Sequence, residues 1–233
     1  MSGCVAATRT RCPAFGRFAG QRDVILDGYA GTIAAVAMRM PGYTSAMRAV
    51  WIEPNQNYLA ERRRLGLDKK DEVWDGVLHM VPPPAYHHVI TSVGLFKALT
   101  PIAERRGLIA LPDGVGLFGA ESDYRIPDGV LHRPDQVTRS GLVSAELVIE
   151  VLSAHDESRD KLEFYAARGV SEVWLVDPQT LVVEVYTLSG GAYVRVPTVA
   201  NQTSSPRLGI TLELTAGPSL ALRDGESVHH VIR

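Results

Sequence analysis

The stretch "ELVIEVLSAHDESRDKLEFYAARGVSEVWLVD", residues 146–177, contains the pattern that decides the predicted fold. Apolar residues dominate 147–152 and again 173–176, and each run has the length of a buried strand. Between them, residues 157–168 space their apolar positions as a helix does. A strand, a helix and a strand in so short a stretch predict two parallel strands joined by a right-handed crossover.

An acid interrupts the first of these strands. Because alternate residues of a strand share a face, Glu150 points to the same side as Val148 and Leu152. Both faces are apolar, which is typical of a central strand covered on both sides. An unpaired ionised carboxylate there would cost on the order of several kcal/mol. The pattern therefore indicates a partner for Glu150: a metal ion, a cation or a shared proton.

The segments on either side of this unit complete the predicted sheet. Before it, Asp75-Gly76 marks a hairpin within 71–81, because glycine accepts the positive φ of a two-residue turn. A helix over 86–106 follows, and its predicted core positions are Val89, Val93, Phe96, Leu99 and Ala103. Further strands are predicted at 108–112, 114–118, 124–132, 181–188, 192–199 and 207–214. The sequence thus predicts an α/β fold of mixed (α+β) type, with a central mixed sheet flanked by helices.

Composition limits the domain count and the class of protein. The chain has 233 residues, 45 % of them hydrophobic, and a net charge of −2. These values suit a single domain, which we place at 47–233, after an extension at 1–46 that shows no sustained pattern and is expected to be poorly ordered. The charge gives no overall basic field for nucleic acid. No run of about eighteen apolar residues is present to span a membrane, and the two cysteines suit the cytoplasm.

Two patterns are set aside. "GVGLFG", residues 114–119, has the spacing of a dinucleotide-binding loop but is followed by a strand that carries an acid, where that loop needs a helix. "ERRRLGLDKK", residues 61–70, could contact phosphates, although most such basic runs are solvated helix faces.

A second acid could share a site with Glu150. Asp128 follows Pro127, which removes a backbone donor, as happens at strand edges and bulges. If the two strands are neighbours, backbones about 4.8 Å apart bring both carboxylates to one cation. Two hard oxygen ligands with room for water suit Mg²⁺.

A lysine follows the second acid. Lys161 lies about one turn into the predicted helix, and its flexible stem could bring an ammonium back over the end of the strand. Beside a metal and a water, this ammonium could orient the nucleophile or stabilise charge on a phosphate. The alternative is that Asp128 is a turn acid and that Glu150 and Lys161 form only a structural ion pair.

The runs "DEVWDGVLHMVPPPAYHH", "IPDGV", "ELVIEVLS", "DKLEFYAARGVSEVWLVDP" and "VEVYTL" closely resemble the Uma-two family of restriction-endonuclease-like proteins. This family is a bacterial branch of the PD-(D/E)XK nuclease superfamily. The resemblance covers roughly residues 50–215 and does not include 1–46. It implies a restriction-endonuclease-like fold and a single endonuclease-like domain.

The resemblance also assigns roles to residues. It makes Asp128 and Glu150 the two acids of the metal site and points to the backbone carbonyl of Val151 as a further ligand. Leu152 occupies the place of the usual lysine, and Lys161 matches the place of its substitute. Glu72 matches an acid near the start of the family's domain, although it could equally be an exposed charge on an edge strand. His87 and His88 match a region that often contains a histidine, and Tyr165 is expected near the site.

Two functions follow from these residues. The first is a Mg²⁺-dependent DNA endonuclease, with Mn²⁺ as a possible substitute, whose catalytic residues are Asp128, Glu150, Lys161 and Glu72. The second is a catalytically silent protein of the same fold that binds nucleic acid or a partner protein, which the missing lysine at 152 and the mildly acidic charge favour. A homodimer is expected, because two sites cut a duplex most easily.

Overall fold

The computed structural model describes residues 56–231 apart from 114, 121, 154–156, 216 and 218, and additionally the backbone of four two-residue strands nearer the N-terminus. The chain divides into two units, Met1–Asn55 and Gln56–Arg233. In the first unit, β1 (Arg22–Asp23) pairs with β3 (Val36–Ala37), and β2 (Ile33–Ala34) pairs with β4 (Val50–Trp51). The predicted disorder of 1–46 lies almost wholly outside the described residues and stays a prediction, as does the boundary at 47.

The second unit is built on a six-stranded mixed sheet. Its order is β14 (Ala192–Arg195), β13 (Val183–Ser189), β12 (Glu172–Val176), β11 (Leu147–Val151), β10 (Gly129–His132) and β7 (Ile109–Pro112). The pair β11–β12 is parallel and the other pairs are antiparallel. The parallel pairing and the central position predicted for the Glu150 strand are confirmed, since β11 lies between β10 and β12 and all five of its residues are buried.

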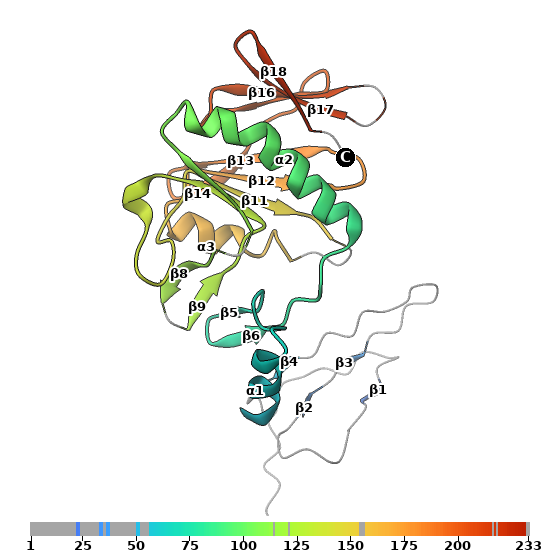
Figure 1. Ribbon diagram of the computed structural model, residues 1–233, viewed down its shortest axis with the longest axis vertical. Coiled ribbons are helices and arrows are strands. Elements are labelled where there is room, and N and C mark those ends of the chain that lie inside the picture. The colour runs from blue at the N-terminus through green and yellow to red at the C-terminus, as the bar shows by residue number, and fades with distance from the viewer. Residues whose placement is uncertain are drawn as a thin grey trace, which may run out of the picture. The chain divides into compact units, whose positions relative to one another are not determined.

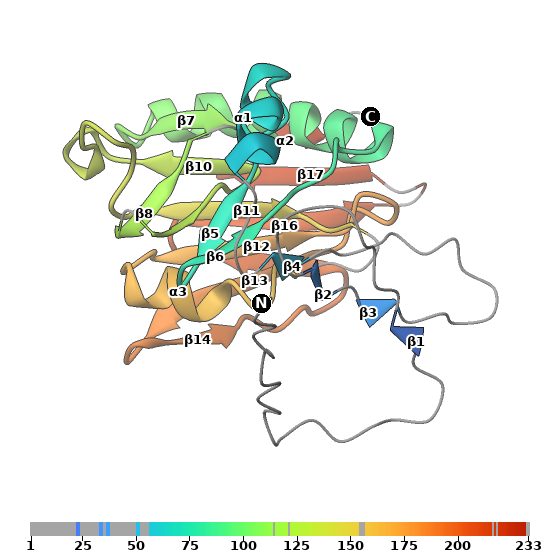
Figure 2. The ribbon, with the colours of Figure 1, turned by 90° about the horizontal axis from the view of Figure 1, so that it is seen from below.

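Two helices cover opposite faces of this sheet (Figures 1 and 2). On one face α2 (Tyr86–Glu104) packs Leu95, Leu99 and Ile102 against the odd-numbered residues of β11. On the other face α3 (Leu162–Ala167) packs Phe164 and Tyr165 on the side of Val148. A turn over 158–161 precedes α3, so Lys161 stands at its N-cap, earlier in the helix than the sequence predicts.

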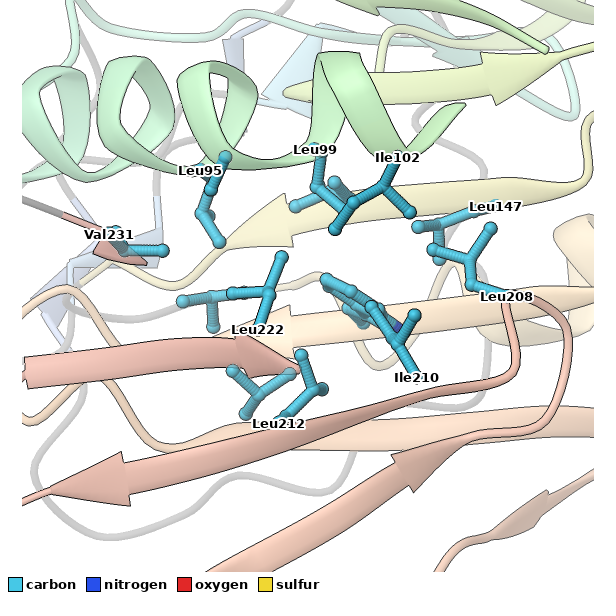
Figure 3. Packing of buried hydrophobic residues seen from close by; sticks show 14 of the residues in the cluster. Leu95, Leu99, Ile102, Leu147, Leu208, Ile210, Leu212, Leu222 and Val231 are labelled. Atoms are coloured by element: carbon cyan, nitrogen blue, oxygen red, sulfur yellow. The ribbon is translucent and has the colours of Figure 1, made fainter. Parts of the chain in front are cut away.

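A second sheet extends the core on the α2 side. Its four antiparallel strands are β15 (Gln202–Ser205), β16 (Ile210–Thr215), β17 (Ser219–Asp224) and β18 (Ser227–Val231). Figure 3 shows Leu212 and Leu222 from these strands facing Leu95 and Leu99 of α2. The prediction that the 207–214 strand would join the central sheet is therefore wrong, because its apolar face packs against the helix that covers that sheet.

A third, smaller sheet holds the first residues of the site. Within Gln56–Arg233 its order is β6 (Val77–His79), β5 (Glu72–Trp74), β9 (Asp123–Arg125) and β8 (Leu117–Ala120). The predicted hairpin is confirmed, with φ of 47° at Asp75 and 84° at Gly76. The predicted strand over 124–132 is divided at Pro127: β9 belongs to this sheet and β10 to the central one.

The remaining elements are α1 (Gln56–Arg64) and the short 3₁₀ helix η1 (Pro134–Gln136). Every residue of α1 is at least partly exposed. Within the described part of the chain, neither α2 nor another helix combines the length and hydropathy needed to cross a membrane.

Candidate active site

Glu150 occupies the face of β11 that α3 covers, and its side chain is 4 % exposed. The hydroxyl of Tyr165, on α3, donates a hydrogen bond of 2.5 Å to Glu150 Oε1. This contact follows from the strand period and the helix position together, because both side chains point into the layer between β11 and α3. The acid is therefore held at a fixed place inside the protein.

Lys161 places its ammonium between two acids. Its Nζ lies 2.9 Å from Glu72 Oε1 and 3.2 and 3.3 Å from Glu150 Oε1 and Oε2, and its side chain is 12 % exposed. Burial alone would lower the pKa of Lys161, but the negative charges of Glu150 and Glu72 raise it well above its ordinary value. The lysine is thus a permanent positive charge at neutral pH, and its stem reaches back over the strand as the sequence suggested.

Glu72 belongs to the small sheet and faces the same ammonium. Its Oε1 accepts a hydrogen bond of 2.8 Å from the Ile126 amide, and its Oε2 accepts one of 2.7 Å from the Trp74 indole. The residue is 2 % exposed and β5 has β6 and β9 as neighbours. The alternative interpretation, an exposed charge on an edge strand, is therefore wrong for Glu72.

Asp128 joins the cluster from the segment between β9 and β10. The ladder of β10 and β11 ends at the pair Gly129–Ile149, so Asp128 lies one residue beyond it, opposite Glu150 in register. Its Oδ2 accepts a 2.8 Å hydrogen bond from the amide of Val151. The predicted neighbourhood of the two acid-bearing segments is confirmed, but Asp128 precedes its strand, because the chain leaves the sheet at Pro127.

The other oxygen of Asp128 faces a histidine and a lysine. His88 Nε2 donates to Asp128 Oδ1 at 3.0 Å, and Lys70 Nζ lies 4.0 Å from the same oxygen. Burial would raise the pKa of Asp128, but the hydrogen bonds and charges of His88, the Val151 amide and Lys161 lower it overall. Of the two histidines in "HH", His88 is at the site and His87 is exposed.

Lys70 was missed as a site residue in the sequence, where it was one of several charges in a basic run. Lys70 ends the turn over 65–70 that precedes β5, so the alternation of a strand does not relate it to Glu72, and no local pattern marks it.

Around Lys161 the carboxyl groups outnumber the buried ammonium group. Three carboxylates, of Glu72, Asp128 and Glu150, surround the ammonium of Lys161. Burial, with the charges of Asp128 and Glu72, raises the pKa of Glu150 to about 8 even though Lys161 and Tyr165 act in the opposite direction. The pKa of Glu150 thus lies near neutral pH, and the partners that the structure gives this acid are the Lys161 ammonium and the Tyr165 hydroxyl.

The arrangement fits a small hard cation. Among the described residues, no three His, Cys, Asp or Glu side chains are placed to hold a metal ion together. Mg²⁺ needs fewer, because it keeps several waters and binds through one or two carboxylates with substrate phosphates. The side-chain donors of Asp128 and Glu150 are carboxylate oxygens, the hard ligands that such a cation takes. Val151 follows Glu150 directly, and its amide donates to Asp128, so the backbone of Val151 lies beside both acids.

Burial of an acid does not by itself identify the site. Glu146 and Glu172, at the other end of β11 and β12, are 2 % and 0 % exposed. Their oxygens accept hydrogen bonds from protein donors, which include Gln136 and Ser171 for Glu146 and Ser205 for Glu172. Glu150 differs from them because two further carboxylates, those of Glu72 and Asp128, lie near it. Leu152, in the place of the usual lysine, packs its side chain on the apolar layer beside α3.

The structure is that of an α/β protein with a mixed central sheet, in which acids and a lysine gather at one end of the parallel pair. The chain belongs to the Uma2 family, described as "Putative restriction endonuclease", whose profile matches residues 58–222. The resemblance seen in the sequence is thus confirmed.

One solved structure found in a comparison with this chain is that of a "putative nuclease belonging to DUF820 from Anabaena variabilis ATCC 29413". The two chains share 18 % identity, with a TM-score of 0.49 over 60 % of this chain and 83 % of the other. No curated protein matches the chain.

Proposed function

We propose that this protein is a Mg²⁺-dependent endonuclease that hydrolyses phosphodiester bonds of DNA, with Mn²⁺ as a substitute. The observation that carries the proposal is the ammonium of Lys161, held between Glu72 and Glu150 beside Asp128. A neutral substrate would gain little from a fixed buried cation, whereas a phosphate gains charge as it reacts, and a preorganised cation stabilises that charge.

Each side chain has a distinct part in this proposal. Asp128 and Glu150, with the Val151 carbonyl, would hold the cation, which when bound lowers the pKa of the attacking water and neutralises phosphate charge. Lys161 stabilises the developing negative charge and orients the water. Glu72 fixes the ammonium, since its other contacts, to the Ile126 amide and the Trp74 indole, prevent it from turning away.

The test is cleavage of a supercoiled plasmid with Mg²⁺ or Mn²⁺. We expect nicking or linearisation by the natural protein, and a loss of about 100-fold or more in Glu150→Gln and Asp128→Asn, because each removes charge but little volume. Glu146→Gln is the matched control, a buried acid on the same stretch of chain that should leave cleavage intact once circular dichroism shows it folded. Cleavage that survives Glu150→Gln would refute the assignment. Tight DNA binding with no cleavage under any divalent cation would indicate the catalytically silent alternative.

We also propose that the protein acts as a homodimer in the bacterial cytoplasm. The reason is symmetry, because two sites related by a twofold axis can address the two strands of a duplex together. Light scattering at working concentration should give twice the chain mass of 25.3 kDa, and a monomer that still makes double-strand breaks would contradict the proposal.

A further inference from the structure

Lys70 is the cation of the cluster that the mechanism above does not use. Its Nζ forms an ion pair with Asp113 and lies 4.0 Å from Asp128 Oδ1. The exposed fraction of the side chain rises from 14 % for Asp128 to 26 % for Lys70 and 51 % for Asp113. The three residues therefore form a series of increasing exposure, in which Lys70 lies between the buried Asp128 and the solvent-exposed Asp113.

The backbone around Lys70 is fixed on both sides. The next residue, Asp71, is 4 % exposed and accepts hydrogen bonds from Arg62 at 2.6 to 3.0 Å and from the Val81 amide at 3.2 Å. Asp113 is fixed as well, since its amide donates to the Asp128 carbonyl at 3.0 Å. Lys70 is thus presented at a defined place beside Asp128.

The partner of Lys70 is easily exchanged. Asp113 is half exposed, and ion pairs with an exposed member contribute little because water screens them. An incoming phosphate could therefore replace the Asp113 carboxylate at little cost. Lys161 differs in this respect, because two buried carboxylates hold it in place.

We propose that Lys70 is a substrate-positioning residue that binds a phosphate of the nucleic-acid backbone beside the one hydrolysed, and that Asp113 occupies this subsite in the free protein. The inference rests on the proposed function, because it takes the cluster at Asp128 as the place of reaction. In this proposal the Asp113 carboxylate competes with the phosphate for Lys70. It keeps the lysine oriented until a phosphate displaces it.

The two partners give opposite predictions, which separates this proposal from a structural ion pair. Lys70→Gln removes the phosphate contact, whereas Asp113→Asn removes the competitor. Asn also tolerates the left-handed backbone at position 113, where φ is 56°. If the pair were merely structural, both variants would break the same contact and would shift binding in the same direction. Lys69→Gln is the matched control, the exposed neighbour with the same change of charge.

The experiment measures binding of a fluorescein-labelled DNA duplex in EDTA, by anisotropy over a series of salt concentrations. For Lys70→Gln we expect weaker binding and a slope of log K against log salt that is smaller by about 0.9, the value for one lost phosphate contact. Asp113→Asn should bind more tightly with the natural slope, and Lys69→Gln should match the natural protein. In the cleavage assay, Lys70→Gln should raise KM more than it lowers kcat.

The outcomes separate this inference from the proposed function. Equal effects of Lys70→Gln and Lys69→Gln, or shifts of Lys70→Gln and Asp113→Asn in the same direction, would overturn the inference even if plasmid is cut. Lys70-dependent binding without cleavage would support the phosphate contact and refute hydrolysis. A natural protein that neither binds nor cuts DNA would overturn both.

Discussion

Replacing Lys161 by Met tests whether the ammonium holds the site together. Met keeps an unbranched stem of similar length but leaves Glu72 and Glu150, whose side chains are 2 % and 4 % exposed, without their shared cation. Removing one partner of a buried ion pair costs about 3–5 kcal/mol, because the remaining charge stays buried. We therefore expect a loss of about 3 kcal/mol in the free energy of unfolding at pH 7, where Glu150 is partly protonated.

The loss should grow with pH, and its sign follows from the pKa of Glu150. In the natural protein this pKa is raised from 4.5 to about 8, so the folded state binds an extra proton and its stability falls as pH rises from 4.5 to 8. Without Lys161 the pKa of Glu150 rises further, and the fall continues above pH 8. The difference in the free energy of unfolding between the natural protein and Lys161→Met should then widen by up to about 1.4 kcal/mol per pH unit.

Urea denaturation, monitored by tryptophan fluorescence at pH 7 and pH 9, measures this difference in the free energy of unfolding. Lys97→Met, an exposed lysine on α2, is the control and should change little. Adding Glu150→Gln to Lys161→Met should recover stability at pH 9, because the uncompensated charge is then absent. Equal unfolding midpoints for Lys161→Met and the natural protein at pH 9 would refute the reasoning.

Three further predictions concern single residues. Glu150→Gln should flatten the decline of stability between pH 4.5 and 8, and urea midpoints that keep the natural slope over this range would contradict it. Gly129→Ala places a Cβ 2.2 Å from the Phe96 ring and should cost about 1–3 kcal/mol by calorimetry, less in a Phe96→Leu background; an unchanged Tm argues against the packing. Arg62→Ala should speed hydrogen exchange throughout α1, because Arg62 ties that helix to Asp71; unaltered exchange would show that other contacts hold it.

The central unit could be predicted because its signals are local. Short, mainly apolar runs predicted β11 and β12, and Asp75-Gly76 predicted the hairpin. The helix α2 was located, but its buried face was only partly correct: Val89 and Val93 are 45 % and 43 % exposed, while Leu95 and Ile102 are fully buried. Apolar residues surround this helix, because it packs between two sheets at its C-terminal half, so periodicity alone could not orient it.

The site was predictable where a residue contradicts its surroundings, and hidden where contact depends on tertiary structure. Glu150 stands out inside an apolar strand, and Asp128 follows a proline. By contrast, the burial of Glu72 and the place of Lys70 depend on how the small sheet meets the central one, which no local pattern reports. Glu146 and Glu172 are as buried as Glu150, but their oxygens accept hydrogen bonds from protein donors away from the cluster. Burial of an acid therefore does not by itself predict a site residue.

The division of one predicted strand at Pro127 has a mechanical consequence. Ile126 donates its amide to Glu72 of the small sheet, while Asp128, two residues later, accepts from Val151 of the central sheet. Lys161 then joins the same two sheets through its ammonium. The cluster of Glu72, Asp128, Glu150 and Lys161 therefore also connects the small sheet to the central sheet. A displacement of the hairpin β5–β6 would therefore move Glu72 relative to Glu150 and disturb the position of the Lys161 ammonium that both acids hold.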